Sequence, residues 1–159
     1  MEGKKVSESK AIIAQVMNPE SANPAGNVHG GDIMKLIDTA GGVAATRHAR
    51  AYVVTASIDR MSFHHPVFVG EFLTMKASVN FVGRTSMEVG VRVEAENAIT
   101  GEKRHTASAY LTYVALGQNR RPIPLPPLLL ETEEDRHRNA EASARRQTRL
   151  AERKKEKEA

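Results

Sequence analysis

The chain has 159 residues, of which 40% are hydrophobic and 26% are charged. This composition is that of an ordinary globular domain, and it argues against a disordered chain and an integral membrane protein. The absence of Cys excludes disulfides, thiolate metal sites and a cysteine nucleophile, and it suits a reducing compartment. A net charge of +4 favours an anionic ligand, but there is no dense basic stripe of the kind that binds duplex DNA. We therefore expect a cytoplasmic protein with a phosphate-bearing small ligand and no nucleic-acid or membrane partner.

The first part of the chain predicts a strand, a loop and a long helix. An apolar run at 11–17 predicts the strand, and the Pro-, Asn- and Gly-rich segment 18–27 predicts the loop. Apolar residues then recur at helical spacing, so we expect a helix from about Gly31 to His48. Gly41 and Gly42 in its middle each cost ~1 kcal/mol relative to Ala, which predicts close backbone contact with a sheet or a partner subunit.

After residue 51 the hydrophobic period changes to two, which is typical of antiparallel strands buried on one side. The expected strands cover 52–58, 63–69, 72–82, 87–96 and 103–115. In the strand at 72–82, alternation puts Leu73 and Phe81 on the same apolar face. One long helix followed by long antiparallel strands predicts an α+β domain whose sheet curls around the helix.

We divide the chain into a flexible N-terminus at 1–9, a folded domain at 10–117, a Pro-rich extension at 118–130 and a charged C-terminal tail at 131–159. The prolines oppose regular structure in the extension. The tail has almost no apolar periodicity, so it is expected to be an exposed helix or a disordered segment, frayed after about Arg146. Truncation after Ala142 should then leave stability nearly unchanged.

The junction between the loop and the helix is a candidate anion site. Gly30 and Gly31 follow His29 and open the predicted helix. The N–H groups at a helix start, together with the helix dipole, suit a phosphate or a developing oxyanion. An ordinary turn and helix cap is the alternative explanation of the same residues.

Asp38 is a carboxylate inside an otherwise apolar helix. A buried carboxylate is costly and tends to mark a functional site. The alternative is a solvent-facing Asp paired with Lys35 on the same helix.

The predicted turn between the strands at 72–82 and 87–96 offers polar donors. Arg84 would bind a phosphate as a rigid fork, and Thr85 and Ser86 add hydroxyl groups. A plain hairpin turn explains these residues equally simply.

The histidines do not predict a metal site. His64 and His65 are adjacent in a predicted strand and so point to opposite faces. The other histidines show no ligand spacing with a carboxylate. We therefore expect no bound metal.

The order of these motifs resembles the hotdog-fold acyl-CoA thioesterases of the cytosolic acyl-CoA hydrolase type, in their single-domain form. The likeness runs from about residue 10 to 135. Its motifs are Asn23-x-x-Gly26-Asn27-Val28-His29-Gly30-Gly31, Lys35-Leu36-Ile37-Asp38, Ala44-Ala45-Thr46-Arg47-His48, Val54-Thr55-Ala56-Ser57-Ile58-Asp59 and Arg84-Thr85-Ser86-Met87-Glu88-Val89. The resemblance implies a hotdog fold, in which a curved antiparallel sheet of five to six strands wraps a long central helix. It also implies a homodimer, often assembled into a hexamer as a trimer of dimers.

The resemblance further implies hydrolysis of fatty acyl-CoA to free fatty acid and CoA, without a metal or cofactor. The family's catalytic residues map to Asn23 and Asp38, which come from different domains or subunits. Its CoA contacts map to Ala56, Ser57, Ile58, Thr85, Ser86 and Met87.

We assign roles to these groups as hypotheses. Asp38 acts as general base on water or attacks the thioester carbon, and Asn23 orients the water or substrate. The N–H of Gly31 or a neighbour stabilises the oxyanion. His29 and Gly30 contact the substrate, and Arg84 holds the phosphates of CoA.

Helix geometry supports a site shared between subunits. Asp38 lies seven residues after Gly31, ~10 Å along the helix axis, which is too far for one thioester carbonyl to reach both. In a two-fold dimer with antiparallel helices, the helix start of one subunit approaches Asp38 of the other.

Two other classes of function stay open. One is a different hotdog enzyme such as an acyl-CoA dehydratase, which usually needs an Asp–His pair that the sequence does not show. The other is a non-enzymatic acyl-CoA sensor. Control of DNA by such a sensor would need a helix-turn-helix, and the residues before the first strand leave no room for one.

Overall fold

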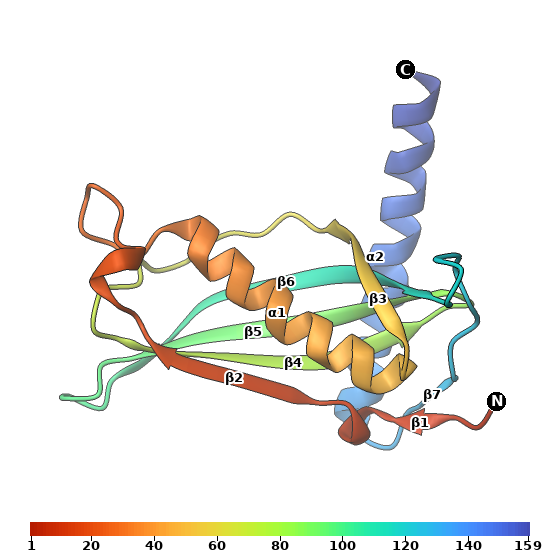
Figure 1. Ribbon diagram of the computed structural model, residues 1–159, viewed down its shortest axis with the longest axis horizontal. Helices are drawn as coiled ribbons and strands as arrows, with labels where there is room; N and C mark the ends of the chain where they lie inside the picture. Colours follow the sequence, from red (N-terminus) through yellow and green to blue (C-terminus); the bar gives the residue numbers. More distant parts are fainter.

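A five-stranded antiparallel sheet wrapped around one helix forms the body of the protein (Figure 1). The computed structural model describes residues 1–159. The sheet order is β2-β4-β5-β6-β3, with strands β2 (Ala11–Val16), β3 (Tyr52–Ile58), β4 (Phe72–Val82), β5 (Ser86–Glu96) and β6 (Lys103–Leu116). Helix α1 (Gly30–Ala49) lies across the concave face of this sheet. The α+β hotdog architecture predicted from the sequence is confirmed, and the predicted ends of α1 and of these strands are correct to within one residue.

The core lies between α1 and the concave face of the sheet. Alternate residues of the strands face the helix, because successive side chains of a strand point to opposite faces. The large apolar side chains of the central strands that are buried there are Leu73, Met75, Val79, Met87, Val89, Val91, Val93, Leu111 and Tyr113. Ile33, Ile37, Ala40 and Ala44 of α1 pack against them at the predicted helical spacing. Small residues on α1 let the helix lie close to the sheet.

The strand expected at 63–69 is absent. This segment makes only isolated bridges, from Phe63 to Ala107 and from Phe68 to Asn27. Pro66 in its middle has no amide hydrogen to donate to a ladder, so the segment follows the body as a loop.

The sheet has three register shifts, and two of these β-bulges lie next to residues of interest and change which face they occupy. One lies between Val79 and Phe81 in β4, and it pairs Phe81 with Glu88 on the outer, convex face. The alternation of the sequence placed Phe81 on the apolar inner face, and that prediction is wrong because one extra residue shifts the register. The second bulge lies between Thr55 and Ser57 in β3.

The first nine residues and the Pro-rich extension pair with each other. Strand β1 (Lys4–Lys5) runs parallel to β7 (Leu128–Leu129), and a short 3-10 helix, η1 (Val6–Glu8), follows β1. Lys4 donates its Nζ to the carbonyl oxygen of His48 at 2.9 Å, which caps the end of α1. The expectation of a flexible N-terminus is therefore wrong, whereas the expected lack of regular structure in the extension holds for residues 118–127 and fails only at β7. The pairing of β1 with β7 joins residues far apart in the sequence, so a local sequence pattern does not predict it.

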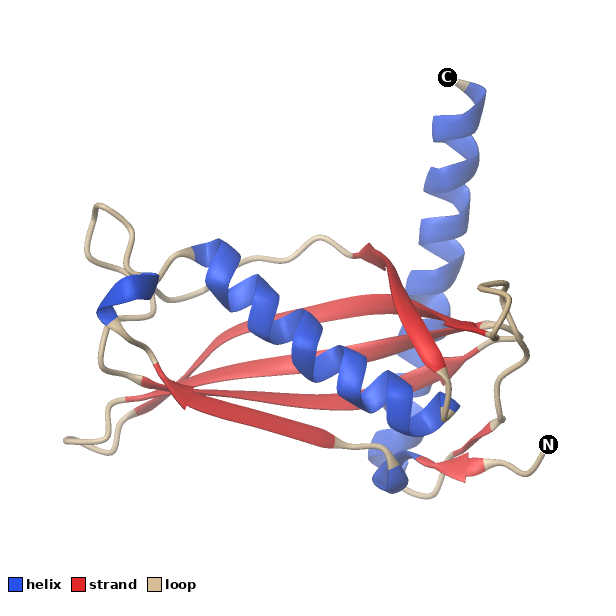
Figure 2. Cartoon of the chain, viewed as in Figure 1, coloured by secondary structure: helices blue, strands red, loops and turns tan.

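The C-terminal tail forms a second helix, α2 (Glu133–Glu158), on the convex face of the sheet (Figure 2). Thr132 and Asp135 form a capping box that begins the helix. The first half of α2 is docked, since Ala142 is fully buried and Asn139 donates its Nδ2 to the Asn80 carbonyl at 3.0 Å. The final nine residues are exposed, and the end of the helix projects beyond the body. Neither helix of the protein has a stretch long and apolar enough to cross a membrane.

A buried carboxylate on β5 anchors α2. Glu88 is 1% exposed and accepts two hydrogen bonds from Arg145, at 2.9 and 2.8 Å, in a bidentate ion pair. Arg149 donates to Glu88 at 3.1 Å and to Asp59 at 2.9 Å. Burial on its own would raise the pKa of Glu88, but the hydrogen bonds from Arg145, Asn80 and Arg149 bring that pKa below its ordinary value. The expected fraying after Arg146 is contradicted by these contacts and by the helix that continues to Glu158.

Truncation after Ala142 is now expected to destabilise the protein. It removes both arginines that neutralise Glu88, and a loss of about 2 kcal/mol would lower the melting temperature by about 5 °C. Truncation after Leu150 is the matched control, because it removes only exposed residues. Equal, wild-type melting temperatures for both truncations in a thermal unfolding experiment would show that α2 does not contribute to the stability of the body.

Candidate active site

Asp38 sits where α1 passes β3 and β6, and its carboxylate is fixed by two hydroxyl groups. Thr55 of β3 donates its Oγ1 to Asp38 Oδ1 at 2.8 Å. The hydroxyl of Tyr113 in β6 lies 2.9 Å from the same Oδ1 and 3.0 Å from the carbonyl oxygen of Asp38. No group of the chain hydrogen-bonds Oδ2. One carboxylate oxygen is thus held in place, and the other is available to a ligand or water.

Tyr113 is a fully buried donor to this carboxylate. Burial, followed by the hydrogen bond to Asp38, raises the pKa of Tyr113 far above its ordinary value. Its hydroxyl therefore stays protonated and continues to donate. The alternative interpretation of Asp38, a surface residue paired with Lys35, does not hold, because the structure contains no such ion pair.

Gly41 makes room for the Tyr113 hydroxyl. A Cβ added at Gly41 would lie 2.5 Å from the Tyr113 oxygen and 3.3 Å from two of its ring atoms. The close approach predicted for this glycine is therefore to a side chain of the sheet. Gly42 is different, since a Cβ there would meet nothing within 4 Å in this chain.

The bulge in β3 turns neighbouring residues toward opposite sides of the strand. Thr55 pairs with Tyr113 and faces α1, whereas Ser57 pairs with Thr112 and faces outward. Without the extra residue Ala56, Thr55 and Ser57 would share one face. Because of the bulge, Thr55 contacts Asp38 on the inner side of β3 while Ser57, two residues later, lies on the outer side.

Asn23 lies in the loop before α1, and a local turn fixes its side chain. Its Oδ1 accepts hydrogen bonds from the amides of Ala25 and Asn27, at 3.0 and 3.1 Å. No group of the chain accepts a hydrogen bond from Nδ2. The turn thus presents one oriented amide donor, while no contact within the chain joins Asn23 to Asp38.

The start of α1 differs from the prediction. His29 is the N-cap of the helix, and its Nδ1 accepts a hydrogen bond from the Gly31 amide at 3.0 Å. In this structure His29 therefore already occupies the Gly31 N–H, and the hypothesis that Gly31 or a neighbour stabilises an oxyanion stays a prediction. The amide of Gly30 has no partner in the chain and is the available donor at this helix start.

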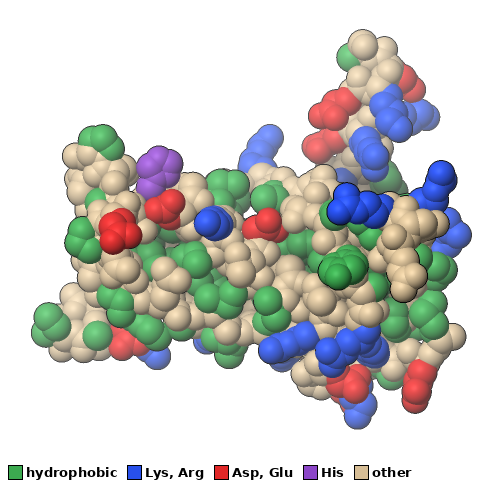
Figure 3. Space-filling view, viewed as in Figure 1, with side chains coloured by type: hydrophobic (Ala, Val, Ile, Leu, Met, Phe, Trp, Pro, Cys, Tyr) green, Lys and Arg blue, Asp and Glu red, His purple; other side chains and the backbone are tan.

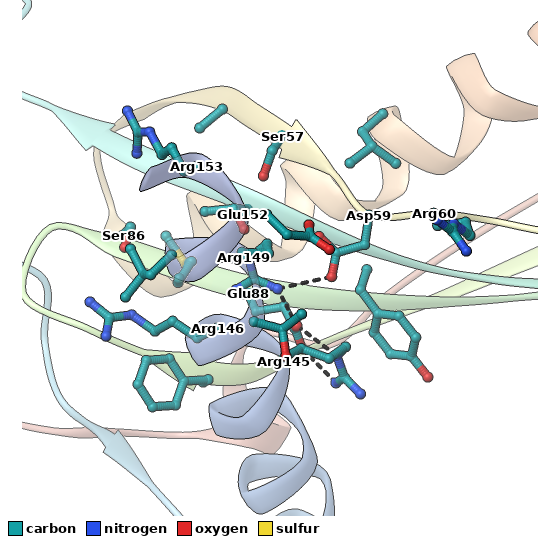
Figure 4. Close-up of a pocket in the computed structure, with 18 of the residues that line it drawn as sticks. Ser57, Asp59, Arg60, Ser86, Glu88, Arg145, Arg146, Arg149, Glu152 and Arg153 are labelled. Atoms are coloured by element: carbon teal, nitrogen blue, oxygen red, sulfur yellow. Dashed lines mark hydrogen bonds and ion pairs between the residues drawn. The ribbon is translucent and has the colours of Figure 1, made fainter. Parts of the chain in front are cut away.

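A cavity of about 1170 Å³ lies on the outer side, between α2 and the ends of β3, β5 and β6 (Figure 4). Of the predicted substrate contacts, it is lined by Ala56, Ser57, Ile58, Ser86 and Met87. Arg60, Phe81, Tyr110, Arg145, Arg146, Arg149 and Arg153 also line it. Five predicted residues from separate stretches of sequence thus meet in one cavity, beside the strand that carries Thr55.

Four predicted substrate-binding residues do not line this cavity. Arg84 is exposed at the β4–β5 turn, and its carbonyl oxygen accepts a hydrogen bond from the Leu125 amide. Thr85 next to it accepts one from the Ala115 amide through its carbonyl oxygen. His29 and Gly30 lie at the other end of the body, at the start of α1.

The sequence did not reveal several residues of this region. Thr55 and Tyr113 occupy ordinary strand positions, and only their contact with Asp38 distinguishes them. The arginines of α2 belong to a segment expected to stand apart from the body. A signal was present at Gly41, whose cost in a helix implied a close neighbour, although it did not say which one.

The structure brings together no group of three or more His, Cys, Asp or Glu side chains that would hold a metal ion. His64 and His105 pack edge to face, with ring centroids 5.8 Å apart, as an aromatic contact.

Residues 25–102 match the model of the thioesterase superfamily. The chain is 37% identical over 142 residues to the cytosolic acyl coenzyme A thioester hydrolase of Rattus norvegicus, an alignment of 88% of this chain and 37% of that protein. The chain thus spans little more than a third of that relative's length. It is 38% identical over 141 residues to Protein VdlD of Helicobacter pylori, covering 89% of this chain and 80% of VdlD.

Solved structures of similar chains share the whole architecture, including α2. An acyl-CoA hydrolase of Bacillus cereus superposes with a TM-score of 0.94 at 34% identity, over 99% of this chain and 96% of that one. An acyl-CoA hydrolase of Staphylococcus aureus, solved with butyryl coenzyme A and coenzyme A, gives 0.91 at 32% identity, over 98% and 94%. A hexameric acyl-CoA thioesterase gives 0.92 at 36% identity, over 96% and 97%.

Alanine substitutions at two neighbouring glycines test the packing of Tyr113, which holds the carboxylate of Asp38. Gly41→Ala forces a methyl group against buried Tyr113, and overpacking of about 2 kcal/mol should lower the melting temperature by about 5 °C. Gly42→Ala, the matched control, should keep or raise the melting temperature because Ala favours the helix by ~1 kcal/mol. Calorimetric scans of the two variants decide the matter. An unchanged Gly41→Ala protein would mean that Tyr113 does not pack on this glycine.

Proposed function

Because the chain belongs to the thioesterase superfamily, we propose that it is an acyl-CoA thioesterase that hydrolyses fatty acyl-CoA to free fatty acid and CoA. The single observation that carries this proposal is the fixed carboxylate of Asp38, with one oxygen anchored by Thr55 and Tyr113 and the other available. The names of the similar proteins from rat, Bacillus cereus and Staphylococcus aureus support the same activity.

Asp38 supplies the reacting group in this proposal. Its Oδ2 removes a proton from a water molecule that adds to the thioester carbon, or attacks that carbon itself. In both cases the C–S bond breaks and the thiolate of CoA leaves and takes up a proton. When Asp38 attacks the carbon itself, water then hydrolyses the resulting anhydride, which releases the fatty acid and restores the carboxylate. The two hydroxyl groups on Oδ1 prevent the carboxylate from rotating, so Oδ2 needs little reorganisation during the reaction.

The amide donors at the start of α1 take part from a second subunit. Asn23 presents Nδ2 and Gly30 presents its N–H, and both groups are suited to hold a water, a carbonyl or an oxyanion. Gly31 replaces Gly30 in this role only if the His29 side chain leaves its amide. Since no contact joins Asn23 to Asp38 within the chain, each site takes these residues from different copies.

The edge strand β3 supports such an assembly. Its outer edge is unpaired, and Tyr52, Val54 and Ile58 on it are 82%, 46% and 38% exposed. An exposed apolar edge strand readily pairs with another chain. A second copy that pairs antiparallel along β3 would form a two-fold dimer near Asp38. We propose a homodimer, and a hexamer built from three such dimers; one of the similar structures is hexameric.

The outer cavity receives the nucleotide part of CoA. Five of the predicted substrate contacts line it. One of them, Ala56 in the bulge of β3, directly follows Thr55, which contacts Asp38. With the nucleotide in the cavity, the pantetheine arm of the substrate would run along β3 toward Asp38. Hydrolysis then needs no metal or cofactor, and we propose a cytoplasmic location, as the name of the rat relative has it.

Asp38's surroundings distinguish hydrolysis from the alternatives. A dehydratase of this fold would need a His beside the Asp, whereas the partners of Asp38 are two hydroxyl groups. Tyr113 and Thr55 position a carboxylate without accepting its proton. An acyl-CoA sensor would bind the same ligand, but it would release no thiol.

A thiol-release assay across acyl-CoA thioesters of increasing chain length tests this function. The wild-type protein should release CoA from at least one of them. Asp38→Asn preserves the shape of the side chain and removes the base, so kcat should fall by roughly 10²–10⁴ while CoA still binds. Glu94→Gln is a control, since that carboxylate lies on the outer face of the sheet. Thiol release from no thioester would refute the enzyme proposal, and full turnover by Asp38→Asn would move the chemistry elsewhere.

A further inference from the structure

The wall that α2 contributes to the outer cavity is rich in arginine. Five arginines and four carboxylates line the cavity. Arg145 and Arg149 are committed to Glu88 and Asp59. Arg60 on the body and Arg146 and Arg153 on α2 make no ion pair, although Glu152 and Glu156 also line the cavity. The cavity therefore carries guanidinium groups that the structure itself does not neutralise.

Arg146 and Arg153 lie on the same face of α2. They are seven residues apart, which is two turns and ~10 Å along the helix axis. Figure 4 shows both side chains pointing to the side of the cavity where Ser86 lies. The Arg146 guanidinium lies over the ring of Phe81, 5.6 Å from its centroid, which orients it.

The bulge in β4 creates part of this arrangement. It turns Phe81 outward, beneath α2, where the ring meets Arg146. The buried pair between Glu88 and Arg145 fixes the position of the helix on the sheet. Two arginines of α2 thus line the same cavity as the strand residues Ser57 and Ser86.

We propose that Arg146 and Arg153 form a phosphate clamp that binds the diphosphate and 3′-phosphate groups of the CoA nucleotide, which makes α2 part of the substrate site. Guanidinium groups bind phosphate oxygens through paired, charge-assisted hydrogen bonds. This inference rests on the proposed function for the identity of the ligand. It also replaces Arg84, the phosphate ligand expected from the sequence, which lies outside the cavity.

Calorimetric titration with CoA tests the clamp on the full-length protein. In the double variant Arg146→Gln/Arg153→Gln, loss of two charge-assisted contacts should raise the Kd for CoA by about 10- to 100-fold. Lys154→Gln/Lys157→Gln is the matched control, since it removes the same charge from exposed positions of α2 outside the cavity. The control should keep the wild-type Kd. A double variant with a Kd within twofold of wild type would overturn the clamp.

Kinetics with a truncated substrate separates binding of the nucleotide from damage to the protein. The double variant should show a raised KM for butyryl-CoA but an unchanged kcat/KM for S-butyryl-pantetheine, which has no phosphate. An equal loss with both thioesters would contradict the clamp, because the nucleotide would then be irrelevant. If the wild-type protein cleaves neither thioester, the proposed function is wrong for these substrates, and the CoA titration still decides whether the arginines bind phosphate.

Discussion

The hydrogen bonds from Thr55 and Tyr113 to Asp38 are the constraint on which the proposed site depends. They place one carboxylate at the meeting point of α1, β3 and β6 and leave its second oxygen available. A glycine at position 41 is needed for the tyrosine to reach that point. Gly41 lowers the stability of the helix, but it leaves room for buried Tyr113 to orient the carboxylate of Asp38.

The two faces of the sheet pack against different helices and border different parts of the proposed site. The concave face packs against α1, which carries Asp38, while the convex face packs against α2 and forms the arginine-lined cavity with it. At the bulge around Ala56 in the edge strand β3, neighbouring residues face these two different sides. Figure 3 shows hydrophobic side chains spread across the α1 face between isolated charges, and charged side chains crowded along the projecting end of α2. In the proposed function, the thioester beside Asp38 and the nucleotide in the cavity accordingly lie on different sides of one strand.

The sequence predicted the elements whose partners are local, and it missed those held by distant residues. Hydrophobic period identified α1 and the long strands, and an acidic side chain among apolar neighbours marked Asp38 as a candidate site residue. Tyr113 has the same alternation as its apolar neighbours in β6, so its role becomes visible only through contact with α1. α2 looked unattached because its docking depends on Glu88, some sixty residues away, rather than on an apolar stripe. A bulge leaves no alternating signature, and so Phe81 was assigned to the wrong face.

Complementation between inactive variants tests the central claim, that Asp38 works with an amide donor of another subunit. Asn23→Ala and Asp38→Ala should each be nearly inactive alone. When equal amounts are unfolded and refolded together, random pairing places intact Asn23 beside intact Asp38 at roughly a quarter of all sites. The account therefore predicts recovery of roughly a quarter of the wild-type thioesterase activity. Background activity in mixed oligomers that mass spectrometry has verified would contradict it.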